Sequence, residues 1–192
     1  NTTGTRNTAS GAYSLSNNST ADNNTAFGYQ VLEACSTGAQ NTAVGTYALD
    51  ASTTASDNTA VGYNSLGTNT TGATNTAVGK DSLFGNTTGS HNTAIGNGAG
   101  LSVTTGIQNV LIGTFAGDAL TDADYNTVVG YSALGNENLG SRSTALGAYA
   151  LNVQRNNSAT DAYNTAIGHA AGVAVTTGTN NTFVGGLAGD GT

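Results

Sequence analysis

Hydrophobic and polar residues follow each other along this chain in a pattern that returns every 17 residues. The clearest segment is Asn24–Gly28, which recurs as Asn41–Gly45 and again as Asn58–Gly62. In each copy a polar Asn-Thr pair precedes two apolar residues and a glycine. A short fixed period with Asn, Thr and Gly in register is typical of a solenoid, in which each repeat forms one coil stacked on the last. The pattern predicts an all-β chain, a parallel β-solenoid or β-roll with 17-residue coils.

Eleven copies fill the chain, which is predicted to be a single solenoid segment over residues 1–192. One interval, from 143 to 164, is longer by four residues, and the excess falls within 152–163. Insertions in solenoids map to surface loops, so we expect this segment to bulge outward. Neither end carries an atypical capping repeat, which favours a fragment of a longer array. The copies begin at residues 7, 24, 41, 58, 75, 92, 109, 126, 143, 164 and 181.

Counting each copy from position 1, the apolar residues at positions 3 and 4 define a strand. Position 3 is alanine in eight copies, and position 4 is Val, Ile, Leu or Phe in every copy except the first, which has Ser10. Successive side chains of a strand point to opposite faces, so two adjacent apolar positions predict burial on both faces. A thin coil has only one interior. We therefore expect other copies of the same chain to cover the second face.

Glycine fills position 5 in all eleven copies and is expected to mark the bend that ends the strand. Stacked coils place identical residues about 4.8 Å apart, so the Asn and Thr columns are expected to form hydrogen-bonded ladders. Position 9 is Leu or Gly, and three of the four copies with Gly have an apolar residue at position 12. This exchange predicts an interior that needs one aliphatic side chain per coil. The residues assigned these structural roles are Gly28, Gly45, Gly62, Gly79, Asn41, Asn58 and Asn75.

The composition excludes several classes of partner. Four Lys and Arg against eleven Asp and Glu give a net charge of −7, which has the wrong sign for a nucleic-acid-binding protein. No apolar run approaches the ~18 residues of a membrane span, so no membrane insertion is expected. The single cysteine, Cys35, permits neither an intrachain disulfide nor a thiolate metal cage.

The residue types that carry catalysis or bind metals are few and scattered. His91 and His169 occupy different coil positions, and no cysteine or paired carboxylates lie near them in sequence. Asp118, Asp122 and Asp124 form an acidic cluster, but the Gly-rich calcium repeat is absent, which favours an ordinary acidic turn. The glycines form neither a phosphate-binding loop nor a dinucleotide fingerprint. The sequence predicts no enzyme, no cofactor and no metal site.

Tyrosines mark the edge of the coil just past the bend, at positions 6 and 7. Rings there can cover the turn or stack on sugars, and both interpretations stay open. The tyrosines of position 6 and the long interval are the features that we most expect to project from a uniform coil. The candidate ligand-binding residues are therefore Tyr29, Tyr63, Tyr131, Asn152, Arg155 and Tyr163.

The string Asn-Thr-Ala-Val-Gly-x-x-Ser/Ala-Leu, found at 58–66 and 75–83, resembles the head repeats of trimeric autotransporter adhesins. It is more similar still to the repeat arrays of phage-type tail fibres and related bacterial surface proteins. The resemblance covers the whole chain and implies a left-handed coil in a homotrimeric fibre, outside the cell or on a virion. This coil is longer than the adhesin coil and has a Thr-Thr-Gly turn. No position matches a defined binding motif of the family, so no ligand residue carries over.

Three functional hypotheses follow. The leading one is a structural and adhesive fibre segment that mediates or spaces attachment to a cell surface, with copies of itself and surface glycans as partners. A second is a Thr-rich ice-binding or surface-binding solenoid, although Thr at position 2 shares a face with position 4, which we expect to be covered. A third is a self-assembling extracellular filament in which open strand edges stack end to end.

Overall fold

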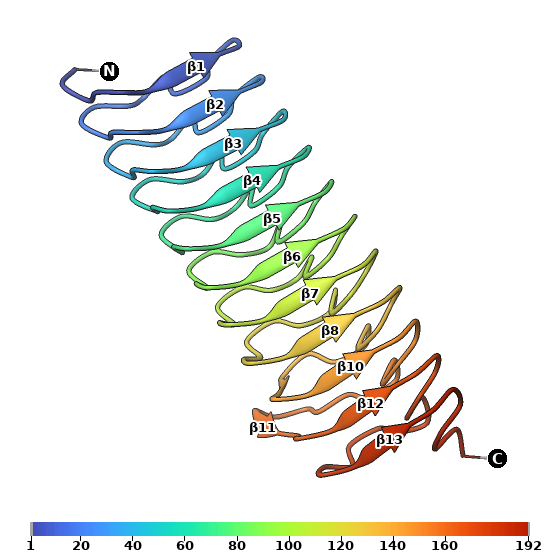
Figure 1. Ribbon diagram of the computed structural model, residues 1–192. Helices are drawn as coiled ribbons and strands as arrows, with labels where there is room; N and C mark the ends of the chain where they lie inside the picture. Colours follow the sequence, from blue (N-terminus) through green and yellow to red (C-terminus); the bar gives the residue numbers. More distant parts are fainter. Residues whose placement is uncertain (1, 192) are drawn as a thin grey trace.

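The protein is a regular stack of coils, described over residues 2–191 by a computed structural model (Figure 1). Positions 2 to 4 of each coil form a three-residue strand, and these strands build an 11-stranded parallel sheet along one side of the stack. Strand order in the sheet follows the chain, and the described residues contain no helix. The predicted parallel β-solenoid with 17-residue coils is therefore confirmed.

Eleven strands belong to the main sheet, and two short ones pair beside the long interval. The main strands are β1 (Thr8–Ser10), β2 (Thr25–Phe27), β3 (Thr42–Val44), β4 (Thr59–Val61), β5 (Thr76–Val78), β6 (Thr93–Ile95), β7 (Val110–Ile112), β8 (Thr127–Val129), β10 (Thr144–Leu146), β12 (Thr165–Ile167) and β13 (Thr182–Val184). The two short strands are β9 (Gly140–Ser141) and β11 (Thr160–Asp161).

Identical positions face each other across the whole main sheet. Ala43 pairs with Ala60, one repeat further along the chain. Across the long interval, Thr144 still pairs with Thr165. The extra residues therefore leave the register of the main strands unchanged, and each strand position forms a column along the stack.

Positions 1, 3, 8, 9, 12 and 15 point into the coil and form its core. The predicted exchange at position 9 is confirmed by the packing around the glycines there. A Cβ added to Gly100 would lie 2.7 Å from Cδ1 of Leu111 and 3.4 Å from Cγ2 of Val103. The space of the missing leucine is therefore filled by the residue at position 12, here Val103, and by the residue at position 3 of the next coil, here Leu111. Beside Gly172 the position-3 residue of the next coil is Phe183, which fills the equivalent space.

The asparagines of position 1 form the predicted ladder. The backbone N–H of Asn75 donates to Oδ1 of Asn58, and the N–H of Asn92 donates to Oδ1 of Asn75, both at 2.9 Å. The Asn75 amide also donates to the carbonyl oxygen of Gly89 at 2.9 Å, across the interior of the same coil. Each side chain thus joins its coil to the neighbour and closes its own coil. The threonines of position 13 form a second ladder. For example, the Thr70 hydroxyl donates a hydrogen bond to the carbonyl oxygen of Thr87 in the next coil.

We expect the substitution Asn75→Ala to lower the free energy of unfolding by about 2 kcal/mol, because it leaves the buried N–H of Asn92 unpaired. It also removes one of the two hydrogen bonds that the Gly89 carbonyl oxygen accepts, the other coming from the side-chain amide of Asn86. Urea denaturation followed by circular dichroism measures the loss. The matched control is Thr71→Ala at exposed position 14, which should change the stability very little. Equal stabilities of the two variants would contradict a structural role for the ladder.

Positive backbone φ angles recur at positions 5, 7, 9 and 17 of the first ten coils. At positions 7, 9 and 17 the φ values lie between 48° and 63°, in the left-handed helical region that other residues enter at a modest cost. At position 5 they lie between 126° and 139°, a region that residues with a side chain rarely adopt. This difference explains why glycine is invariant at position 5 alone, and it confirms the predicted bend.

Candidate binding surfaces

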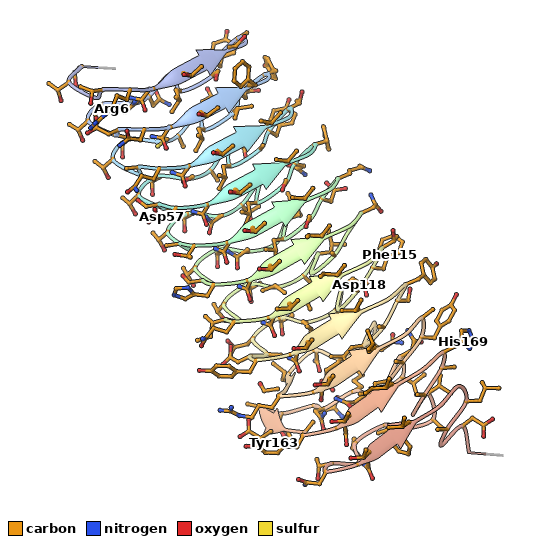
Figure 2. All side chains as sticks on the ribbon, in the orientation of Figure 1. Arg6, Asp57, Phe115, Asp118, Tyr163 and His169 are labelled. Carbon is orange, nitrogen blue, oxygen red and sulfur yellow. The ribbon has the colours of Figure 1, made fainter. Side chains whose placement is uncertain are left out.

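Side chains project from the two edges of the stack and from the outward face of the sheet (Figure 2). The edge past the strand ends is formed by positions 6 and 7, where Figure 2 labels His169 and Phe115. The opposite edge is formed by position 17, where it labels Arg6, Asp57 and Tyr163. Every described residue at position 17 is exposed. A ligand or partner on the side of the stack therefore meets one of these surfaces or the return segment, positions 10 to 15, behind the sheet. End-to-end association would instead use the terminal strands β1 and β13.

Positions 2 and 4 of the main strands form the outward face of the sheet, which we call the sheet face. Position 3 points inward, so position 4 lies outside, and the exposed fraction is 44% for Phe27, 37% for Val44 and 40% for Ile95. Within residues 2–191 the hydroxyls of the position-2 threonines donate no hydrogen bond, so the ladder predicted for that column does not form. The single chain thus buries one face of its strands. On the other face, the threonine hydroxyls of position 2 and the apolar side chains of position 4 form two neighbouring columns that face solvent.

Four tyrosines form a zigzag along the first four coils, which we call the aromatic strip: Tyr13, Tyr29, Tyr47 and Tyr63. Consecutive rings pack edge to face, with centroids 5.9, 5.7 and 6.0 Å apart. The zigzag arises because the ring alternates between positions 7 and 6 from one coil to the next. Burial, and then the neighbouring Tyr47 and Tyr13, raise the pKa of Tyr29. Its hydroxyl is therefore protonated at neutral pH and can donate a hydrogen bond.

A second, shorter row of rings lies on the same edge near the other end of the stack. Tyr131 packs against Tyr149 with centroids 5.3 Å apart, and Tyr149 packs against His169 at 6.1 Å. Sequence reasoning therefore placed the tyrosines of positions 6 and 7 correctly along one edge. It counted only those of position 6 among the candidate ligand-binding residues.

The remaining candidate residues do not join the aromatic strip. Asn152 is half-buried, and its amide donates to the carbonyl oxygen of Ser132 at 2.7 Å. Arg155 is exposed, and its backbone N–H donates to Thr176 in the next coil at 2.8 Å. Tyr163 lies on the position-17 edge (Figure 2). The three candidate tyrosines of position 6 therefore share one edge, whereas Asn152, Arg155 and Tyr163 lie elsewhere around the coil, and the six form no common site.

Tyr163 belongs to a cluster around Arg142 that the sequence analysis missed. The guanidinium carbon of Arg142 lies 4.5 Å from the ring centroid of Tyr125 and 6.0 Å from that of Tyr163. Its Nε lies 3.0 Å from Oδ1 of Asp161, and this hydrogen-bonded carboxylate raises the pKa of Arg142. Tyr125, Arg142 and Tyr163 are successive residues of position 17, which was the available signal. The cluster fastens the long interval to the edge of the stack.

A buried carboxylate, Glu137, anchors the start of the long interval. Its Oε1 accepts hydrogen bonds from the backbone N–H groups of residues 138–140 and of Asn156, at 2.8–3.1 Å. Its Oε2 accepts from the side-chain amides of Gln154 and Asn156, at 2.9 and 2.8 Å. Gln154 and Asn156 are therefore buried, and only part of the long interval bulges outward, chiefly the exposed residues 157–159.

The titratable residues singled out in the sequence lie at separate places in the stack. Within residues 2–191, no group of three or more His, Cys, Asp or Glu side chains is placed to hold a metal ion. Asp122 and Asp124 accept hydrogen bonds from the preceding coil, while Asp118 lies on the return segment, where burial raises the pKa of its carboxyl. The Cys35 thiol points into the core and donates to the carbonyl oxygen of Gly38, and burial raises its pKa.

Comparison with known proteins adds no relative. The chain matches no family model, no curated protein and no solved structure. Across residues 2–191 no helix is long and apolar enough to cross a membrane. The sheet face and the aromatic strip are the surfaces where exposed apolar or aromatic side chains follow each other from coil to coil.

Proposed function

We propose that this chain is a segment of a homotrimeric extracellular or virion fibre that mediates or spaces attachment to a cell surface. The observation that carries the proposal is the open sheet face, where the apolar column of position 4 follows the stack from coil to coil. With neighbouring strands about 4.8 Å apart, eleven strands give a column roughly 50 Å long. Contiguous exposed apolar surface of this kind marks an interaction site in a soluble protein.

The variation in side-chain size along position 4 favours contact with other copies of the same chain. The column contains Ser10, Phe27, Val44 and Leu146, which differ greatly in volume. If the copies surround an axis parallel to the stack, each coil contacts the same coil of its partner chains. The position-4 side chains then need to fit only the identical side chains of the partner chains, and they can differ in volume from one coil to the next. An ice-binding face would instead present the same side chains at every level. Self-association is therefore the better explanation of an apolar column with uneven side chains.

The narrowness of the sheet face supports a closed assembly around a central axis. Only two columns, the hydroxyls of position 2 and the apolar side chains of position 4, point outward from each strand. We place three chains in parallel around that axis, with left-handed coils, because the repeat resembles those of trimeric adhesins and tail fibres. The position-4 residues then form an apolar centre, which would stabilise the fibre in proportion to the area removed from water.

The double substitution Val61→Asp and Ile95→Asp is expected to dissociate the assembly into single chains at micromolar concentration. Each substitution would bring three carboxylates together near the axis, where they are poorly solvated. Sedimentation velocity measures the change. The matched control is Thr54→Asp with Thr88→Asp, which adds the same charge at exposed position 14 and should leave the mass unchanged. An assembly that survives the first pair, with an unchanged circular dichroism spectrum, would contradict the proposed interface.

A further inference from the structure

We propose that the aromatic strip binds a neutral, extended, β-linked polysaccharide chain that lies along the axis of the stack. The inference rests on the proposed attachment function and gives it a ligand class. It depends on a different surface from the one that supports the fibre, because positions 6 and 7 lie past the strand ends and not on the sheet face.

The rings of the aromatic strip are available to a ligand. The exposed fraction is 59% for Tyr13, 41% for Tyr29 and 48% for Tyr63. No hydroxyl of the strip forms a hydrogen bond within residues 2–191, so all of them can bond to a ligand. The residue beside each ring, at the other of positions 6 and 7, is small or uncharged: Ala12, Gln30, Thr46 and Asn64. Each ring therefore stands beside a neighbour that does not cover it.

The spacing of the rings points to an extended sugar chain. Rings at the same position recur every second coil, as with Tyr29 and Tyr63, and two strand spacings amount to roughly 10 Å. In an extended β-linked chain, successive sugars alternate in orientation, so the same face returns with every disaccharide at a similar distance. The C–H face of a sugar can pack on the electron-rich face of an aromatic ring. Rings two coils apart can therefore hold every second sugar of one chain.

The charges around the strip favour a neutral sugar chain. The charged residues at position 10 of the coils that carry the strip, at the start of the return segment, are Glu33 and Asp50, both acidic, and they would repel an anionic polysaccharide. The cation Lys80, next to Tyr63 in the following coil, is paired with Asp81 at 3.4 Å.

Amide groups suited to sugar hydroxyls also lie beside the rings. Gln30 donates to the Glu33 carboxylate, and Asn64 donates to Asp81 at 3.2 Å. These amides are thus already held in place next to the strip.

The test is titration of the full chain with cellohexaose and chitohexaose, with the α-linked maltohexaose as the comparison. The chain has no Trp and eight Tyr, four of which form the strip, so a change in intrinsic fluorescence that is lost in the strip variant reports on the strip, while calorimetry gives the affinity independently. We expect binding of at least one β-linked hexasaccharide and about tenfold weaker binding by the variant Tyr29→Ala, Tyr63→Ala, because two aromatic contacts are lost. The control variant, Tyr125→Ala with Tyr163→Ala, removes two rings from the opposite edge and should keep the affinity.

Three results would overturn the inference: no binding of either β-linked hexasaccharide, equal binding of maltohexaose, or an unchanged affinity after loss of Tyr29 and Tyr63. Circular dichroism verifies that each variant is folded, and the single variant Tyr63→Ala serves if the double variant is not. Sedimentation of the same samples separates this inference from the fibre proposal. Trimers that bind no glycan would overturn only the ligand assignment, whereas single chains that bind it would overturn only the assembly.

Discussion

Replacing Glu137 by alanine is expected to lower the free energy of unfolding by roughly 4 kcal/mol, because it removes the acceptor for several buried donors at once. The substitution leaves the N–H groups of residues 138–140 and of Asn156 without an acceptor. It also removes the hydrogen bond that the Gln154 side-chain amide donates to the carboxylate. Thermal and urea denaturation measure the global loss. Hydrogen exchange should also show faster opening of residues 152–161 than of the other coils.

Two further variants separate the charge of Glu137 from its shape. Glu137→Gln keeps the length of the side chain but turns an NH₂ group toward amides that also donate, so we expect a smaller loss of stability. Asp57→Asn makes the same change of charge at an exposed position and should have almost no effect. If Glu137→Ala unfolds like the parent chain, water must satisfy those donors and the carboxylate does not anchor the long interval.

Replacing Gly62 by valine is expected to lower the free energy of unfolding by about 3 kcal/mol or more. The φ angle of Gly62 is 139°, which a β-branched residue adopts only with strain. A Cβ at this position would also lie 2.4 Å from the carbonyl oxygen of Gly79 in the next coil. The neighbouring atom is backbone, so it cannot move aside without disturbing the stack. Urea denaturation of the variant and the parent chain gives the difference.

The variant Gly185→Val separates the two causes. Gly185 has a φ of 122°, in the same region, but nothing lies within 4 Å of a Cβ added there. We expect it to lose only the strain component, about 1–3 kcal/mol. Equal losses at Gly62 and Gly185 would mean that backbone conformation alone requires glycine. No loss at Gly62 would contradict the role given to the bend.

Most of the fold could be predicted because the period, the strand and the bend each leave a mark in the sequence. The invariant glycine of position 5 marks a φ that other residues avoid. The positive φ angles at positions 7, 9 and 17 left no such mark, because residues as different as Leu66 and Thr74 are tolerated at φ values of 52° and 59°. A period therefore reveals a conformation only where that conformation excludes most residue types.

The candidate surfaces were predictable where one position repeats and were missed where different coils meet. The tyrosines of positions 6 and 7 recur in register, so their edge could be located. Asn152, Arg155 and Tyr163 were grouped because they are close in sequence, but the perimeter of the coil separates them. The contacts of Glu137 with Gln154, and of Arg142 with Tyr163, depend on where the long interval returns to the stack. The 17-residue pattern carries no information on that path.

The central claim, a homotrimer joined through the sheet face, is tested most directly by sedimentation equilibrium of the unmodified chain at micromolar concentration. The chain has a mass of 18.8 kDa. We predict a single species of three times that mass, whose mass falls to one chain in the Val61→Asp, Ile95→Asp variant. If the unmodified protein sediments as a folded monomer of 18.8 kDa over the whole concentration range, the claim is contradicted.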